Sequence, residues 1–424
     1  MGKRYQINEY DQGILMLKPC SHFWTDINLN IFRKEIVNCC KRYQQNEVKI
    51  SDFEKYGTDF WTKRPEVYED KKVFLEGKFP KGCKSCALQH PNSLYNTWNW
   101  WKDKPQDFFV DLLDRDETYK IEIALSTTCN MTCLYCGPKV SSSWADVLGK
   151  PVVQIDDEWK KAALESLFKY IQEKMTKNTK RVVYTFLGGE TFLDLSFWEI
   201  LDRIAGIHDN EIEINFISNL NVKPKLIQRL VNLANAKPNI KWRISPSIED
   251  LGERAEAVRE GLDFKLFESN YDWILSEPAI DKIAVLPTMN LLTIHKHTEF
   301  LKWVLSKNIK IRGAKNLHKT WTVSLNRVTE PDWLDPAIMP KSSRLEIDRA
   351  ISFIKNESKR FGDTKNITDM YLGNLRDLRN VIGSKRTPKM IEILKWKLDK
   401  NTKLFKRDYY KIFPELKDIV DENK

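Results

Sequence analysis

The chain has 424 residues, 42% of them hydrophobic, and a formal net charge of +10 at pH 7. This length favours two or three domains, and the hydrophobic fraction is enough for a sizeable core. No apolar run approaches the roughly 20 residues that span a bilayer, and the opening residues lack the apolar stretch of a signal peptide. We therefore expect a cytoplasmic protein without a membrane segment. The charge permits a polyanionic partner such as nucleic acid, but interleaved acids and bases are typical of solvated helix faces.

The N-terminal part, residues 1–118, is rich in Trp and Lys and shows few clean repeats. Disulfides are rare in a reducing cytosol, so grouped cysteines indicate metal binding or catalysis. We expect a separate module here that holds a metal or a cluster. It contains five of the eight cysteines, which are Cys20, Cys39, Cys40, Cys83 and Cys86.

Short β-rich runs and helix-patterned stretches then alternate. Six such repeats predict an α/β fold, in which a parallel sheet curls into a partial (β/α)6 barrel over residues 119–330. The expected strands are Tyr119–Leu125, Val182–Leu187, Glu211–Ile217, Ile240–Pro246, Lys282–Pro287 and Thr320–Leu325. The expected helices are Glu158–Lys174, Phe197–Ile207, Pro224–Ala234, Leu266–Leu275 and Ile294–Leu305.

Polar or unusual residues follow five of these strands. In a parallel barrel the chemistry lies at the carboxyl ends of the strands, so we expect the active site at this rim. The residues are Cys129, Cys133 and Cys136 after the first strand, Gly188, Gly189 and Glu190 after the second, Ser218 and Asn219 after the third, Ser247 to Asp250 after the fourth, and Thr288 to Asn290 after the fifth.

Beyond the sixth strand, Pro331, Pro336 and Pro340 interrupt regular structure and indicate a linker. The remaining pattern is helical and highly charged, so we expect a C-terminal helical extension over residues 331–424. Its Lys-rich stretch Lys395–Lys411 fits either a clamp for a polyanion or, more commonly, a solvated helix face.

Cys129, Cys133 and Cys136 have the spacing C-x3-C-x2-C within one expected loop. A [4Fe–4S] cube usually takes four thiolates, so a loop that supplies three leaves one iron open to an outside ligand. A zinc site or a plain electron-transfer cluster is the alternative. Structural zinc usually takes separated Cys pairs or a Cys/His mixture, and no His lies near this loop.

This spacing resembles the cluster motif of the radical S-adenosylmethionine (SAM) superfamily, and the resemblance extends along the chain. Tyr135 matches the aromatic residue that lies near the adenine in that family. Gly188, Gly189 and Glu190 match its Gly-Gly-Glu motif, which receives the SAM amino group. Glycines permit close backbone approach, and a carboxylate accepts hydrogen bonds from an ammonium.

Further residues resemble SAM contacts of the same family. Ser218 and Asn219 lie where it places ribose-contacting groups. Ser247 and Arg259 resemble the pair that holds the SAM carboxylate in the SPASM/twitch branch, a task that suits the bidentate fork of Arg. A surface ion pair of Arg259 with Glu256 or Glu260 explains the spacing equally well.

Two acidic residues follow the fourth strand, and their spacing allows two roles. Glu249 and Asp250 fit either a base for a substrate radical or caps of the following helix.

The N-terminal cysteines resemble the auxiliary module of twitch-domain relatives. The shared pattern is Pro-Cys, a β-hairpin, Cys-Cys and then Leu-x-Gly-x-x-Pro-x-x-Cys-x-x-Cys. The resemblance implies a second [4Fe–4S] cluster, which in this group either relays an electron from an oxidised substrate radical or helps to bind the substrate, and four thiolate ligands favour the relay. Zinc at the same ligands is the alternative, and Cys40 can replace Cys39. The implied ligands are Cys20, Cys39, Cys83 and Cys86.

Taken together, the resemblance implies a radical SAM enzyme that cleaves SAM reductively to a 5′-deoxyadenosyl radical and abstracts hydrogen from its substrate. It implies an electron donor such as flavodoxin or ferredoxin. A peptide or protein substrate is favoured because SPASM/twitch relatives often modify peptides, with a nucleotide or nucleic acid as the alternative. A non-catalytic iron–sulfur or zinc protein that binds nucleic acid competes, but it has no reason to carry the Gly-Gly-Glu motif.

Overall fold

We describe the protein from a computed structural model. It describes residues 20–39, 47–76, 78–81, 83, 112–175, 182–317, 325–358 and 365–420. The chain divides into two compact units. The first comprises Met1–Ser126, Gln154–Leu187 and Glu199–Ile214, and the second Thr127–Val153, Gly188–Trp198 and Asn215–Lys424. The three sequence-based domains, 1–118, 119–330 and 331–424, stay a prediction.

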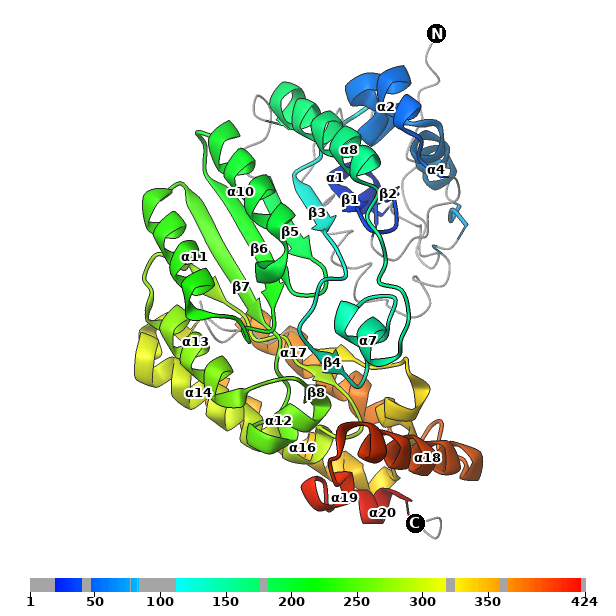
Figure 1. The fold of residues 1–424 in the computed structure, drawn as a ribbon, viewed down its shortest axis with the longest axis vertical. Coiled ribbons are helices and arrows are strands. Elements are labelled where there is room, and N and C mark those ends of the chain that lie inside the picture. The colour runs from blue at the N-terminus through cyan, green and yellow to red at the C-terminus, as the bar shows by residue number, and fades with distance from the viewer. Residues whose placement is uncertain are drawn as a thin grey trace, which may run out of the picture. The chain divides into compact units, whose positions relative to one another are not determined.

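Within the described residues the fold is mixed α/β, as predicted, with a seven-stranded sheet in the order β2-β1-β3-β5-β6-β7-β9 (Figure 1). The pairs β1–β3, β3–β5 and β7–β9 are parallel, while β1 and β2 are antiparallel. This sheet is compatible with the expected partial barrel. Its strands are β1 (Asp26–Asn30), β2 (Glu35–Val37), β3 (Lys120–Ala124), β5 (Val182–Leu187), β6 (Ile212–Ser218), β7 (Ile240–Pro246) and β9 (Lys282–Ile283).

The predicted strand bounds are confirmed for β5 and β7 and differ by one residue at each end for β3 and β6. Of the fifth predicted strand, Lys282–Pro287, only Lys282–Ile283 forms a strand, β9, although the N–H groups of Ala284 and Leu286 still donate to carbonyls of β7; the short strand β10 (Thr288–Met289) follows the predicted range. Of the sixth predicted strand, Thr320–Leu325, only Leu325 is described, and a short strand directly after it, β11 (Asn326–Arg327), pairs in parallel with β10. Residues 320–324 of that prediction lie outside the described residues.

The hairpin expected between the first cysteine groups is present, formed by β1 and β2, with Asn28 opposite Val37. The sequence did not predict that β1 would join the main sheet, where Asn28 lies beside Glu122 of β3. All residues of β1 except the last are buried, as expected for a strand inside a sheet.

The helices of the first unit include α1 (His22–Thr25), α2 (Ile50–Tyr56), α3 (Phe60–Lys63), α4 (Pro65–Leu75) and α8 (Asp157–Tyr170), the last continued by a π-helical turn, Ile171–Met175. Aromatic side chains from several of these helices pack against one another. The ring of Phe53 contacts those of Phe60, Trp61 and Trp159 at centroid distances of 4.8 to 6.1 Å. Such ring pairs stabilise a core beyond the area they bury.

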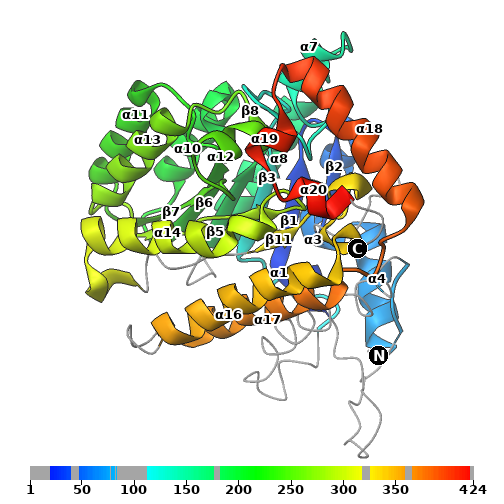
Figure 2. The ribbon, with the colours of Figure 1, turned by 90° about the horizontal axis from the view of Figure 1, so that it is seen from below.

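Apart from its strands, the second unit consists mainly of helices. Its helices include α7 (Ser142–Val147), α11 (Pro224–Ala236), α12 (Gly252–Val258), α13 (Phe264–Ser276), α14 (His297–Arg312), α16 (Arg344–Ser358), α17 (Lys365–Val381), α18 (Pro388–Phe405), α19 (Tyr409–Ile412) and α20 (Leu416–Val420), while α10 (Leu195–Ile207) has residues in both units. Figure 2 shows α16 and α17 side by side, and Arg379 of α17 pairs with Asp348 of α16 at 2.6 Å. The predicted helical character after residue 343 is confirmed.

Helix α11 illustrates why these segments fold as they do. Pro224 occupies its first turn, where a missing N–H costs nothing. The residues that it buries, Ile227, Leu230, Val231 and Ala234, recur at three- and four-residue intervals along one face. No described helix combines the length and the apolar character needed to cross a membrane.

Candidate active site

The cysteine loop, residues Cys129–Cys136, lies in the second unit and is fixed to the end of α12. Its short strand β4 (Thr132–Cys133) pairs antiparallel with β8 (Arg259–Glu260). The N–H of Leu134 also donates to the carbonyl of Val258 over 2.9 Å. The loop position therefore depends on where α12 and β8 lie.

Two glycines allow other segments to approach this loop closely. A Cβ on Gly189 would lie 2.3 Å from the carbonyl oxygen of Thr128, which no side chain could tolerate. A Cβ on Gly261 would lie 2.9 Å from the carbonyl oxygen of Asn130, and its φ of +96° already favours glycine. The close approach at Gly189 lets the next residue, Glu190, donate its N–H to Thr128 over 2.7 Å.

The segment Ser141–Trp144 fixes the loop from the other side. The hydroxyl of Ser143 donates to the carbonyl of Cys129 over 2.6 Å, and the indole N–H of Trp144 donates to the carbonyl of Cys133 over 2.8 Å. These hydrogen bonds give the loop carbonyl groups the partners that a helix or a sheet would otherwise provide. The loop backbone is thereby held without using its thiols.

The three predicted cluster ligands differ in their surroundings. Cys133 is buried, Cys129 is half-buried and Cys136 is exposed. A hydrogen bond with Cys136 lowers the pKa of the Cys133 thiol, against the effect of burial and with help from Arg259. Burial raises the pKa of Cys129 to about 11.

Among the described residues, no group of three or more His, Cys, Asp or Glu side chains is arranged as a metal site, and this includes the three thiols. The donor set nevertheless fits an iron–sulfur cluster, because thiolates are its usual ligands. Cys133 and Cys136 are in hydrogen-bond contact, and Cys129 is close enough to interact electrostatically with Cys136. The role of this loop as a cluster ligand stays a prediction.

Glu190, after β5, is a buried carboxylate held by neutral donors. Its Oε1 accepts from the hydroxyl of Ser218 at 2.7 Å and from the N–H of Phe192 at 3.1 Å. Its Oε2 accepts from the N–H of Asn219 at 2.6 Å. Burial raises the pKa of Glu190 to about 7, although these hydrogen bonds oppose the rise. Within the described part of the chain, no cation is hydrogen-bonded to this carboxylate.

The structure thus brings Glu190, Ser218 and Asn219 together beside the cysteine loop. Asn219 also donates from its side-chain amide to Asn130 Oδ1 over 2.9 Å. Ser218 and Asn219 therefore hold Glu190 and the loop here. Their ribose contacts stay a prediction. Ser247 follows β7, and its N–H donates to the Ser218 carbonyl over 2.8 Å.

Arg259 is buried, so the surface ion pair considered from the sequence is wrong. Neither Glu256 nor Glu260 is its partner. Its Nε and Nη2 pair with the carboxylate of Glu249, the latter at 2.7 Å. Spacing along a helix points to residues three or four apart, whereas Glu249 lies in the segment between β7 and α12, so that the whole of α12 separates it from Arg259 in the chain.

The buried ion pair between Arg259 and Glu249 reaches the cysteine loop. Nη1 of Arg259 donates to Cys133 Sγ over 3.9 Å, and its guanidinium carbon lies 5.4 Å from the centre of the Tyr135 ring. The hydroxyl of Tyr135 donates to Glu249 over 3.0 Å. Burial would lower the pKa of Arg259, but the charge of Glu249 outweighs it and keeps the pKa well above the ordinary value. Glu249 therefore orients Arg259 and Tyr135 in this structure.

In the first unit, two of the predicted auxiliary ligands pack against the same apolar cluster. Cys20 and Cys83 are half-buried and pack against the same apolar cluster, formed by Phe23, Trp24, Phe74 and Leu112. Cys39 follows Asn38, whose amide donates to the carbonyl of Asp26 over 3.0 Å. Cys40 and Cys86 lie outside the described residues.

No protein-family model and no curated protein matches the chain. One solved structure with a similar fold is "Native anSMEcpe with bound AdoMet", with 17% sequence identity and a TM-score of 0.37. The alignment covers 57% of this chain and 62% of that chain, so this chain spans less than two thirds of its length. A likeness at this score does not assign a function.

Proposed function

We propose that the protein is a radical SAM enzyme, in which Cys129, Cys133 and Cys136 bind a [4Fe–4S] cluster and Glu190 helps to bind SAM. The observation that carries this proposal is the position of Glu190. It is a fully buried carboxylate that receives only neutral hydrogen bonds from the described residues, and its backbone is bonded to the residue before Cys129. A buried charge without a cation is costly unless a ligand compensates it.

The ammonium group of SAM carries the positive charge that no hydrogen-bonding partner of Glu190 supplies. A charge-assisted hydrogen bond from an ammonium to this carboxylate is stronger than a neutral one. The carboxylate already has a fixed orientation, since three donors hold its two oxygens. Binding would therefore order few additional protein groups, which favours affinity.

A cluster held by Cys129, Cys133 and Cys136 would, once reduced by the electron donor, supply the electron that cleaves SAM to methionine and a 5′-deoxyadenosyl radical for hydrogen abstraction. The protein residues set the surroundings of that chemistry. Arg259 directs an N–H toward Cys133, and hydrogen bonds to cluster sulfurs are one determinant of the reduction potential. Glu249 occupies the Nε–Nη2 edge of Arg259, so a SAM carboxylate would have to use the remaining N–H groups.

The proposal extends to a second cluster in the first unit, with Cys20, Cys39, Cys83 and Cys86 as ligands. The packing of Cys20 and Cys83 against the same apolar cluster supports it. An electron donor such as flavodoxin or ferredoxin and a peptide or protein substrate complete the proposal, and both stay predictions.

Anaerobic reconstitution with iron and sulfide tests this function. We expect reconstituted protein to hold iron and to release 5′-deoxyadenosine from SAM after reduction. Cys133→Ser should abolish this release, whereas the matched variant Cys20→Ala should lose only the iron of the auxiliary site. Zinc in place of iron, or no 5′-deoxyadenosine from the wild-type protein under reducing conditions, would contradict the proposal.

A further inference from the structure

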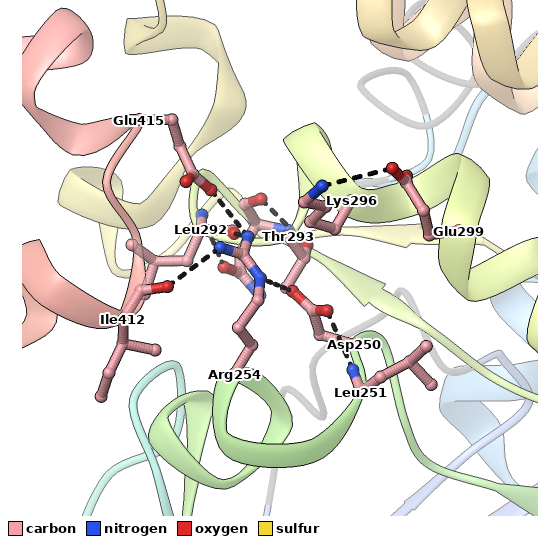
Figure 3. A network of polar contacts seen from close by, with 10 residues as sticks. Asp250, Leu251, Arg254, Leu292, Thr293, Lys296, Glu299, Ile412 and Glu415 are labelled. Carbon is pink, nitrogen blue, oxygen red and sulfur yellow. Dashed lines mark hydrogen bonds and ion pairs between the residues drawn. The ribbon is translucent and has the colours of Figure 1, made fainter.

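Arg254, in the first turn of α12, joins three segments of the second unit (Figure 3). They are the end of β7, the turn after β10 and the C-terminal segment. Nε donates to Asp250 Oδ2 at 2.8 Å, Nη2 donates to the carbonyl of Leu292 at 2.8 Å and to Glu415 Oε1 at 2.7 Å, and Nη1 donates to the carbonyl of Ile412 at 3.3 Å.

These contacts are shielded from water. The side chains of Arg254, Asp250 and Glu415 are 15%, 2% and 12% exposed. The guanidinium carbon also lies 4.4 Å from the centre of the Phe413 ring. Hydrogen-bonded charges that are removed from water hold their partners far more firmly than exposed pairs do. Arg254 therefore binds the C-terminal segment to α12 firmly.

The same C-terminal segment also holds the far end of α12. The hydroxyl of Tyr409 donates to the carbonyl of Ala257 over 3.3 Å. Arg407 pairs with Glu260 of β8 at 2.7 Å. Residues 407–415 thus contact α12 and β8 at both ends, and we call them the C-terminal strap.

Between these two anchor points lies Arg259, the residue that faces Cys133. It directly follows α12 and belongs to β8, which pairs with β4 of the cysteine loop. A helix is stiff along its length because each turn is hydrogen-bonded to the next. A shift at either anchor would consequently move Arg259 relative to the thiol of Cys133.

We propose that Arg254 is a positioning residue for the active site: together with the C-terminal strap it fixes α12, and thereby holds Arg259 and the cysteine loop in their working positions. This inference rests on the proposed function for its catalytic meaning. Its structural part, the coupling from the strap to the loop, concerns only residues of this chain.

The test uses Arg254→Met, which removes every donor, and Arg254→Lys, which restores a cation. The matched control is Arg312→Met, because Arg312 also joins segments by donating to carbonyls, those of Glu277 and Ile280, just before β9 begins. Those contacts lie at the amino end of β9, whereas the candidate site lies at the carboxyl ends of the strands. Should Arg254→Met fail to fold, Glu415→Gln weakens the same junction while keeping its shape.

Three measurements on the full chain are compared. Amide hydrogen exchange of the cysteine loop is measured without the cluster, and SAM affinity and the cluster midpoint potential are measured after reconstitution. We expect Arg254→Met to speed exchange at Leu134, to shift the potential and to weaken SAM binding about tenfold, as coupling of this kind typically does. Arg254→Lys should recover part of each effect, and Arg312→Met should lower thermal stability without them.

The inference would be overturned if hydrogen exchange of the cysteine loop and the cluster midpoint potential changed no more in Arg254→Met than in Arg312→Met. A wild-type protein that takes up no iron and binds no SAM would instead defeat the proposed function. The two failures are distinguishable, because the exchange measurement needs neither group.

Discussion

Glu190 and Glu249 are both glutamates that follow strands of the sheet, β5 and β7, and both are about 1% exposed. They differ in their partners. The hydrogen bonds to Glu190 come from neutral groups of Ser218, Asn219 and Phe192, and Arg259 acts on it through its charge alone, whereas the guanidinium of Arg259 pairs directly with Glu249. Residue type and position in the fold are alike, so the partners alone decide what each carboxylate can do.

The physical consequence concerns where the negative charge is balanced. Glu249 is balanced inside the protein, and it uses its charge to orient Arg259 beside Cys133. The raised pKa of Glu190, about 7 and chiefly an effect of burial, shows that its charge is poorly compensated. A cationic ligand would relieve that cost, which is why we propose that Glu190 binds a ligand and that Glu249 orients Arg259.

The largest expected effect comes from removing the internal cation. Arg259→Met should lower the free energy of unfolding by about 3–5 kcal/mol, because Glu249 would be left buried and unpaired. Urea unfolding measures the loss. The double variant Arg259→Met/Glu249→Gln should regain much of it. A loss below about 1 kcal/mol in the single variant would show that the pair is not buried as described.

Glu190→Gln should have the opposite profile. It should weaken SAM binding about ten- to hundredfold, the equivalent of one lost charge-assisted hydrogen bond. Its free energy of unfolding at pH 8 should not fall by more than about 1 kcal/mol, because the buried charge was itself a cost. Equilibrium dialysis and urea unfolding separate the two quantities. A large stability loss with unchanged SAM affinity would reverse the roles of the two glutamates.

A pH dependence should distinguish Glu190 as well. Its pKa rises from 4.5 to about 7 on folding, so between these values the native state binds the proton more tightly than the unfolded state. The contribution of Glu190 to the free energy of unfolding is therefore complete below pH 4.5. It decreases as the pH rises toward 7, by at most about 1.4 kcal/mol per pH unit. The stability of Glu190→Gln relative to wild type should increase over this range, and a constant difference would contradict the raised pKa.

Tyr135→Phe should give the smallest effect. The variant loses one hydrogen bond to Glu249, worth about 0.5–1.5 kcal/mol. The ion pair with Arg259 remains, so the loop should keep its position. Urea unfolding measures the loss, and hydrogen exchange of the loop should be nearly unchanged.

Sequence patterns predicted the strands that carry both glutamates, because β5 and β7 are runs rich in β-branched and aromatic residues. They also placed the cysteine loop and Glu190 at strand ends. The partner of Arg259 could not be predicted, because helical spacing suggests neighbours within one turn, and Glu249 is ten residues earlier in the chain. The junction at Arg254 was hidden for the same reason: Glu415 lies 161 residues away.

The contrast between the two glutamates can be tested most directly by titrating SAM into the reduced, reconstituted protein and following the cluster by electron paramagnetic resonance. In the wild type, SAM should change the cluster signal, and Glu190→Gln should need at least about tenfold more SAM for the same change. A wild-type signal that SAM leaves unchanged, or identical titrations of the two proteins, would contradict the assignment of Glu190 as the SAM-binding carboxylate.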